Sequence, residues 1–310
     1  MAKKLVSVVI VTRNRKKELS ACLDSIFKMN YPRLEVIVVD NGSTDKTVEA
    51  LKRNFPKVKL VLSKKNLGLN KAKNLGQKQA LGDYILFLDS DTIVDKSFLT
   101  ELVELAESNP QVGIVCPKMY YFDQKDVIWY AGAKVNLLTS QTKNIGCNKK
   151  DCGQFDSVKE TFFAPTAYLA TRKVVEKLDG HEEGFFMTYG DTDYGFRARR
   201  AGFKVMFCPS AKLWHRLGQE ENVKSIRALG YNLPLRAYYF ARNRVVFMKR
   251  HAPKLNFWIF LLFFFPLMTI YITYKIIIFG GAREFLKPHL TGSLDGLKYI
   301  LTGKIENRWI

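Results

Sequence analysis

The chain has 310 residues, of which 47% are hydrophobic and 25% are charged. This composition is typical of a globular protein with one or two domains and excludes a mostly disordered chain. The formal net charge of +20 is unusual, and residues 197–254 carry fourteen Lys or Arg against only Glu220 and Glu221. Because this basic stretch adjoins an apolar segment and shows no nucleic-acid-binding pattern, it favours a membrane surface over nucleic acid.

The cysteines and the N-terminus indicate a cytoplasmic setting for the catalytic part. Five cysteines, odd in number and mostly in apolar surroundings, do not predict a disulfide framework. Cys147 and Cys152 have the spacing of half a zinc site, but no second pair follows, so structural or incidental roles are favoured. The first apolar stretch is too short for a signal peptide and is better interpreted as a strand.

Strand and helix patterns alternate over residues 1–110. Runs of β-branched residues predict buried strands, and apolar residues three and four apart predict helices. Ser43 or Thr44 is expected to cap the second helix. The alternation predicts right-handed βαβ units and a mainly parallel sheet flanked by helices, an α/β fold. Strands are expected at 5–11, 34–39, 58–62 and 84–88, and helices at 17–29, 47–54, 69–81 and 97–108.

The pattern is less regular after residue 110. Residues 136–156 are polar and indicate a surface excursion. A strand-like pattern returns at 161–170, and a strand at 204–208 is followed by 209–215 leading out of it. Short helices are expected at 172–178 and 191–200.

Leu255–Tyr274 forms a run of twenty residues without a charge. As a helix rising about 1.5 Å per residue it is roughly 30 Å long, the thickness of the hydrocarbon core of a bilayer. Pro266 is expected to kink this helix or to divide it into two interfacial arms. Basic residues precede it, as in a cytoplasmic flank. We therefore expect a catalytic domain at 1–225 and a membrane-associated region at 226–310, whose helix at 255–279 either spans the bilayer or lies in its interface.

Two carboxylates, Asp89 and Asp91, follow the buried strand 84–88 and flank Ser90. On an extended backbone their side chains point the same way, and a hard cation such as Mg²⁺ or Mn²⁺ would relieve their repulsion. Polar residues also follow two other predicted strands. Because ligands bind beyond the carboxyl ends of parallel strands, these residues predict one site at that edge of the sheet. They are Thr12, Arg13, Asn14, Asp40 and Asn41.

Eight short motifs occur along the chain: Ser7–Asn14, Val38–Asp45, Asn66-Leu67-Gly68, Asn74-Leu75-Gly76, Leu88–Asp91, Tyr189–Asp193, Arg197–Gly202 and Trp214-His215. Together, in this order, they resemble family 2 glycosyltransferases. The resemblance extends over nearly the whole chain, including Arg242-Asn243-Arg244 ahead of the hydrophobic segment. It implies a Rossmann-like GT-A fold, a nucleotide-diphosphate sugar donor, a divalent metal ion and inversion at the anomeric carbon.

The resemblance also implies roles for single residues. Asp89, Asp91 and His215 are expected to hold Mg²⁺ or Mn²⁺, which steadies the departing diphosphate; a lone histidine can instead be structural. Asp191 is expected to be the general base. Asp193 is the next candidate and a substrate contact, or merely a helix-stabilising acid. Gly190 departs from the family, where a Glu commonly precedes the base.

The remaining expected contacts concern the donor. Asp40 resembles the residue that accepts a hydrogen bond from the nucleobase; an ordinary turn and helix cap is the less favoured alternative. Thr12, Arg13, Asn14 and Asn41 are expected to line the nucleotide cleft, with Asp89 and Ser90 also near the donor. Lys73 and Asn74 correspond to positions near the donor phosphate or ribose, or to a solvated helix face.

The sequence therefore predicts an inverting, metal-dependent glycosyltransferase at the cytoplasmic face of the cell membrane. Its donor is expected to be UDP-, dTDP- or GDP-linked, and its acceptor a glycan or lipid-linked molecule in cell-surface polysaccharide or glycoconjugate synthesis. A rhamnosyltransferase-like activity fits the overall pattern. Two alternatives stay open: a polyprenyl-phosphate sugar synthase, and a non-catalytic nucleotide-binding module that anchors partners to a membrane.

Overall fold

The computed structural model describes residues 3–216, 233–278 and 283–308. The chain divides into two compact units, each described below by itself. The first comprises Met1–Lys134, Lys143–Glu182 and Asp191–Leu217, and the second comprises Val135–Thr142, Glu183–Gly190 and Gly218–Ile310. The domain boundary expected at residue 225 lies outside the described residues.

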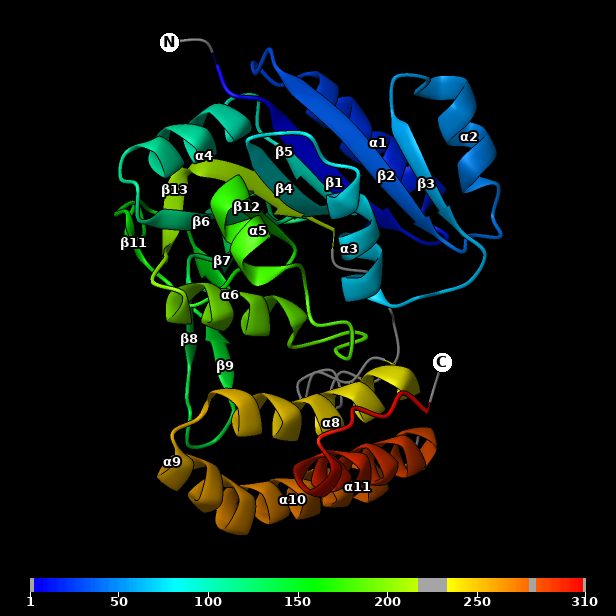
Figure 1. Ribbon diagram of the computed structural model, residues 1–310, viewed down its shortest axis with the longest axis vertical. Coiled ribbons are helices and arrows are strands. Elements are labelled where there is room, and N and C mark those ends of the chain that lie inside the picture. The colour runs from blue at the N-terminus through cyan, green and yellow to red at the C-terminus, as the bar shows by residue number, and fades with distance from the viewer. Residues whose placement is uncertain (1–2, 217–232, 279–282, 309–310) are drawn as a thin grey trace. The chain divides into compact units, whose positions relative to one another are not determined.

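The first unit is built on a mixed α/β sheet whose N-terminal half confirms the predicted βαβ alternation. Four parallel strands lie side by side in the order β4, β1, β2, β3 (Figure 1). The β-branched and aromatic side chains of β4, β1 and β2 are mostly buried, which explains their continuous apolar runs, whereas β3 at the edge of the sheet is only partly buried. The elements are β1 (Val6–Thr12), α1 (Lys16–Phe27), β2 (Leu34–Asn41), α2 (Thr47–Asn54), β3 (Lys59–Ser63), α3 (Leu69–Lys78) and β4 (Tyr84–Asp89).

The strand register brings the polar residues that follow these strands to one edge of the sheet. Thr12 at the end of β1 lies opposite Asp40 of β2, and Val11 lies opposite Asp89 of β4. Because the strands are parallel, their carboxyl ends coincide. The edge predicted to carry the site is therefore formed.

The other half of the sheet is mostly antiparallel. Beyond β4 come β12 (Ala167–Thr171), β6 (Val112–Tyr121), β7 (Val127–Tyr130) and β10 (Lys149–Lys150). Of the segment expected at 161–170, only 167–170 is a strand, and that strand continues to Thr171. The remaining elements are β5 (Thr92–Val94), α4 (Phe98–Glu107), β8 (Ala133–Val135), β9 (Thr142–Asn144), β11 (Lys159–Glu160), α5 (Arg172–Leu178), α6 (Gly190–Arg200) and β13 (Lys204–His215).

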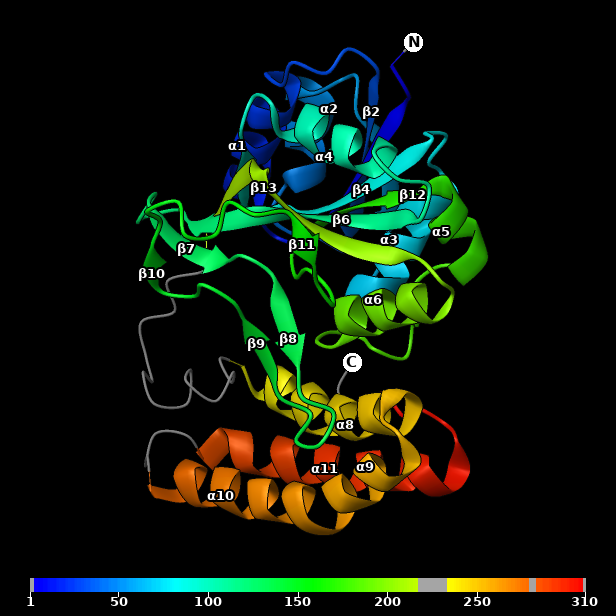
Figure 2. The ribbon, with the colours of Figure 1, turned by 90° about the vertical axis from the view of Figure 1, so that its left-hand side faces the viewer.

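Strand β13 corrects a sequence expectation. It does not end at Cys208 but continues to His215, pairing in parallel with β6 and, near its end, antiparallel with β5 (Figure 2). The register shifts between Cys208 and Lys212, where Pro209 has no N–H to donate to a ladder. Because β13 continues to pair with β5 and β6 after this register shift, His215 lies within the sheet.

The expected cap of α2 is also wrong. Lys46 is the residue before the helix, in a left-handed conformation, and Asp45 Oδ1 accepts from the Thr47 N–H at 3.1 Å. Ser43 and Thr44 instead join the loop after β1: Asn14 N–H donates to Ser43 Oγ, and Thr44 N–H donates to Asn14 Oδ1. Because Ser43 and Thr44 bond to Asn14, they do not cap α2.

The second unit contains the C-terminal helices. α8 and α11 pack closely because α11 presents small residues: a Cβ added at Gly292 would lie 2.2 Å from the Tyr238 carbonyl oxygen. Asn243, fully buried on α8, donates to the carbonyl oxygens of Met187 and Thr188. The helices are α8 (Pro234–His251), α9 (Lys254–Ile259), a π-turn (Phe260–Phe264), α10 (Phe265–Ile278), a 3₁₀ turn (Arg283–Phe285) and α11 (Leu286–Thr302).

Pro266 does not divide the apolar segment into two arms. α9, the π-turn and α10 follow one another from Lys254 to Ile278 as one helix that is long and apolar enough to cross a membrane. Residue 279, the expected end, lies outside the described residues. The Phe265 N–H donates to the Phe260 carbonyl oxygen, five residues back, and this wider turn makes room ahead of the proline ring.

Candidate active site

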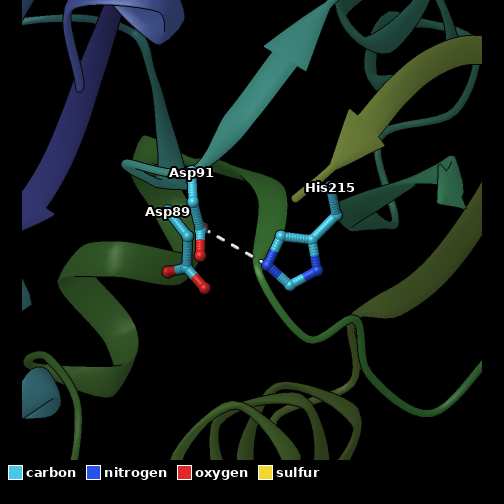
Figure 3. A group of neighbouring side chains, drawn as sticks. All are labelled: Asp89, Asp91 and His215. Carbon is cyan, nitrogen blue, oxygen red and sulfur yellow. Dashed lines mark ion pairs between the residues drawn. The ribbon is translucent and has the colours of Figure 1, made fainter. Parts of the chain in front are cut away.

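Asp89, Asp91 and His215 converge at the carboxyl edge of the sheet (Figure 3). Asp89 ends β4, Asp91 lies in the turn that follows, and His215 ends β13, opposite Thr92 and Tyr121. One ligand atom from each lies within 4.8 Å of the others, and His215 Nε2 is 3.2 Å from Asp91 Oδ1. The three residues predicted as metal ligands are thus brought together.

The two carboxylates are electrostatically unlike. Burial, together with the charges of Asp91 and Asp191, raises the pKa of Asp89 to about 6, against the opposing effect of Lys73. Burial acts in the same direction on Asp91, but its hydrogen bond with His215 and the charges of His215 and Arg15 lower its pKa overall. Arg15 also forms an ion pair with Asp91. The ionised form is therefore disfavoured at Asp89 and favoured at Asp91.

This donor set fits a divalent cation. Two carboxylates and one imidazole suit Mn²⁺, and the carboxylate oxygens suit Mg²⁺. Burial and the nearby charges of Asp91 and Asp191 raise the pKa of Asp89, and a cation bound between the carboxylates would offset those charges. Trp129 lies against the imidazole with ring centroids 4.7 Å apart and limits its orientation.

Asp191 forms a second cluster in the first turn of α6. Lys73 Nζ, on α3, lies 2.6 Å from Asp191 Oδ1, and the side chain of Lys73 is only 2% exposed. The Tyr168 hydroxyl lies 3.4 Å from the same oxygen, hydrogen-bonds His181 Nε2, and its ring faces the Lys73 ammonium. Because the charge of Asp191 raises the pKa of Asp89, the two clusters form one site.

Asn74 braces the loop before α6. Its Oδ1 accepts from the His181 N–H at 2.7 Å, and its Nδ2 donates to the His181 carbonyl at 2.9 Å. Gly180, with φ of +89°, allows this approach, since a Cβ there would lie 2.7 Å from Asn74 Oδ1. This explains Asn74 structurally; its predicted donor contact stays a prediction.

Two buried polar atoms at the ends of β1 and β2 have no partner among the described residues: Thr12 Oγ1 and Asp40 Oδ1. Asp40 Oδ2 accepts from the Ser43 N–H at 3.0 Å, as in an ordinary turn, so only Oδ1 is left over. Buried polar atoms normally have hydrogen-bond partners, so these two atoms on neighbouring strands are able to bind a ligand. They lie where the sequence predicts the nucleobase, and that contact stays a prediction.

The other predicted contacts are used within the protein or lie at its surface. Asn41 accepts from the Leu67 N–H and donates to Asn66, which fixes the loop before α3. Arg13 is exposed and Ser90 is buried. Asp193 is fully buried in an ion pair with Arg197, 2.8 Å from Oδ2 to Nε. Their roles toward a substrate stay predictions.

Sequence reasoning missed Arg15, Tyr168 and His181. Arg15 lies one residue beyond the polar cluster after β1, and its position there is the only signal that could have indicated it. Tyr168 and His181 show no local signal. Tyr168 meets Asp191 because β12 lies antiparallel beside β4, and His181 in turn contacts the Tyr168 hydroxyl.

The fold is similar to those of solved glycosyltransferases that bind nucleotide sugars. One is the mannosyltransferase PcManGT from Pyrobaculum calidifontis in complex with GDP-Man and Mn²⁺, at a TM-score of 0.58 and 17% identity, covering 98% of this chain and 89% of that one. Another is S. aureus TarS 1–349 in complex with UDP-GlcNAc, at a TM-score of 0.56 and 17% identity, covering 97% and 92%. The protein is of the GT-A class.

Residues 7–179 match the family described as Glycosyl transferase family 2, and the chain belongs to this family. It is 27% identical over 307 residues to the dTDP-rhamnosyl transferase RfbF of Shigella flexneri, covering 96% of this chain and 97% of that protein. It is 26% identical to the amylovoran biosynthesis glycosyltransferase AmsB of Erwinia amylovora, covering 81% and 84%. The protein is thus a nucleotide-sugar glycosyltransferase whose homologues act in O-antigen and polysaccharide biosynthesis.

Proposed function

We propose that the protein is an inverting, metal-dependent glycosyltransferase that transfers a deoxyhexose or hexose to a glycan or lipid-linked acceptor in cell-surface polysaccharide synthesis. The observation that carries the proposal is the convergence of Asp89, Asp91 and His215 beside Asp191 at one edge of the sheet. A dTDP-linked deoxyhexose is the first donor to test, because a relative matching 96% of the chain is named a dTDP-rhamnosyl transferase.

Asp89, Asp91 and His215 would hold Mg²⁺ or Mn²⁺ between them. Bound there, the ion supplies positive charge to the diphosphate as the sugar leaves. Arg15, paired with Asp91, lies where it can add a fixed positive charge near the same group. The convergence of two carboxylates and an imidazole within 4.8 Å of one another supports this assignment.

Asp191 is the general base in this proposal. It takes the proton of the acceptor hydroxyl while that oxygen bonds to the anomeric carbon and the bond to the diphosphate breaks. Among the described residues both hydrogen bonds to Asp191 go to Oδ1, so Oδ2 is the oxygen we assign to the proton. The ion pair with Lys73 holds the Asp191 carboxylate in place in the first turn of α6.

The donor is held at the strand ends. Asp40 Oδ1 would accept a hydrogen bond from the nucleobase, and Thr12 Oγ1 would bond to the nucleotide beside it. Arg13, Asn14 and Asn41 complete this wall of the cleft in the proposal. The proposed contacts to the sugar-phosphate part of the donor are Lys73, Asn74, Asp89, Ser90 and Asp193.

The reaction is proposed to occur at the cytoplasmic face of the cell membrane. Residues 1–225 would form the catalytic domain, and 226–310 the membrane-associated region. The helix Lys254–Ile278 supports the second assignment because it is long and apolar enough to cross a membrane.

The test compares turnover of dTDP-, UDP- and GDP-sugars, with Mg²⁺ or Mn²⁺, by the wild type and by Asp191→Asn. Loss of a general base is expected to cost about 10²–10⁴-fold in transfer, while Asp24→Asn, at an exposed carboxylate on α1, is the matched control. Wild-type turnover by Asp191→Asn onto a polyprenyl phosphate would instead indicate a polyprenyl-phosphate sugar synthase. Donor binding without turnover by the wild type would leave only a binding module.

A further inference from the structure

The helix formed by α9, the π-turn and α10 exposes one continuous apolar stripe. Its members recur every three or four residues and have exposed fractions between 51% and 70%. Three are aromatic residues with a polar atom, which favour the boundary between lipid and water. The stripe consists of Leu255, Trp258, Leu262, Phe263, Leu267, Ile270, Tyr271, Tyr274, Ile277 and Ile278.

The opposite side of the same helix is buried in the second unit. Phe257, Phe260, Phe265, Ile272 and Ile276 are between 0% and 7% exposed. The step from Phe260 to Phe265 is one residue longer than an α-helical turn allows. The π-turn supplies this residue, so a single face stays packed on the protein across Pro266. The helix is apolar all round because its two sides have different partners.

α11 extends the exposed stripe. Figures 1 and 2 show α10 and α11 side by side, and they are in contact. Leu290, Leu294 and Leu301 of α11 are exposed at helical spacing, with Lys298 on the same side. Its other side carries Gly292 and packs on α8. Two helices thus present one apolar surface, which we call the α10–α11 face.

The neighbouring helices argue against crossing a bilayer. α8, packed on α11, buries Arg242, and α11 buries Asp295, which accepts from the Tyr238 hydroxyl and pairs with Arg308. A helix that crossed the membrane would carry these groups toward the hydrocarbon, where charged side chains are strongly disfavoured. A helix lying flat buries only its exposed side and leaves α8 on the aqueous side.

The positive charge of the chain favours an anionic lipid surface as the partner of the α10–α11 face. The chain carries a formal net charge of +20. Exposed or partly exposed basic residues flank the α10–α11 face, and lysine stems can lie along lipid while their ammonium groups reach the headgroups. They are Lys249, Lys254, Lys275, Arg283, Lys287 and Lys298.

We propose that the α10–α11 face docks flat into the interface of an anionic membrane leaflet, as a monotopic anchor rather than a transmembrane span. Such helices insert their apolar side about 5–10 Å into the boundary of headgroups and acyl chains. This inference rests on the membrane association in the proposed function and is independent of the transferase chemistry. Both ends of the helix then stay on the same side of the membrane.

The first experiment measures binding of the full chain to vesicles of phosphatidylcholine alone and with phosphatidylglycerol. Binding is expected to be stronger with the anionic lipid and to weaken with salt. Leu262→Glu and Ile270→Glu are expected to weaken it at least tenfold, since each removes an apolar side chain from the docking face and adds a negative charge. Leu81→Glu, at a leucine 76% exposed in the first unit, is the matched control and is expected to bind like the wild type.

The second experiment distinguishes docking from spanning. Green fluorescent protein fused after Ile310 is expected to fluoresce in cells, and alkaline carbonate is expected to release the full chain from membranes. A dark fusion with carbonate-resistant protein would overturn the flat geometry and leave the membrane association standing. If the wild type does not bind vesicles, and instead self-associates in sedimentation in a way that Leu262→Glu abolishes, both the flat geometry and the membrane association are overturned. The α10–α11 face would then bind a second copy of the chain. Donor turnover by Leu262→Glu in solution reports the transferase chemistry separately.

Discussion

Lys73 Nζ and Asp191 Oδ1 lie 2.6 Å apart, and the lysine side chain is only 2% exposed. A buried ammonium needs a partner, and among the described residues the carboxylate of Asp191 provides it. The same lysine acts on Asp89, since its charge opposes the rise in the pKa of that carboxyl. One cation on α3 therefore joins the candidate base to the candidate metal ligands.

Lys73→Met is expected to lower transfer by about 10–100-fold, because Asp191 loses the ion pair that holds its carboxylate in position. Transfer rates at saturating donor and acceptor measure this loss. Lys78→Met, at an exposed lysine on the same helix, is the matched control. Unchanged transfer, or a loss that urea unfolding explains fully by lower stability, would reduce Lys73 to a structural role.

Removal of one candidate ligand should weaken metal binding. His215→Ala and Asp91→Asn are each expected to lower Mn²⁺ affinity by at least 10–100-fold, the range known for loss of a mere outer-shell partner. Titration calorimetry on the nucleotide-bound protein measures this, with His251→Ala, a histidine of the other unit, as control. Unchanged Mn²⁺ affinity in both variants would place the metal elsewhere.

Two buried histidines should make stability fall with acidity. Burial lowers the pKa of His181 well below its ordinary 6.5, and lowers that of His289 to about 4. Below about pH 6.5 the unfolded chain binds protons that these native imidazoles do not, so each costs about 1.4 kcal/mol of stability per pH unit until its native pKa is reached. Urea unfolding at pH 7.5 and 5.5 measures the loss.

The contribution of each histidine is isolated by His181→Phe and His289→Gln, which should each reduce the loss between the two pH values by about 1.4 kcal/mol. The comparison is needed because Asp89 changes stability in the opposite direction. Its pKa is raised from 3.8 to about 6 in the folded protein, so protonation of Asp89 stabilises the fold as the pH falls between these values. Equal pH dependence in wild type and variants would contradict the prediction.

Gly76→Ala should destabilise the protein although alanine is the better helix former. Alanine gains about 1 kcal/mol of helix propensity. A Cβ at Gly76 would, however, lie 2.4 Å from Val9 Cγ1 and 3.0 Å from Val39 Cγ2, and overpacking costs about 1–3 kcal/mol. Thermal or urea unfolding measures the balance. Val9→Ala in the Gly76→Ala background should recover part of the loss, whereas additive effects would argue against the clash.

Local patterns predicted much of the first unit. The strands β1 to β4 and the helices between them follow from continuous apolar runs and helical spacing, which need no knowledge of distant contacts. The errors lie where distant groups compete with local ones. Ser43 and Thr44 bond to Asn14 instead of capping α2, and β13 resumes after its bulge because β5 and β6 offer it partners.

The sequence by itself determined the carboxylate pair at Asp89 and Asp91, because residues two apart on an extended chain share a side. It also determined which strand ends carry polar residues. Only the tertiary structure decided that His215 reaches Asp91, that Lys73 lies against Asp191, and that the apolar helix has a protein side and an exposed side. These depend on contacts between residues far apart in the chain, which no local period encodes.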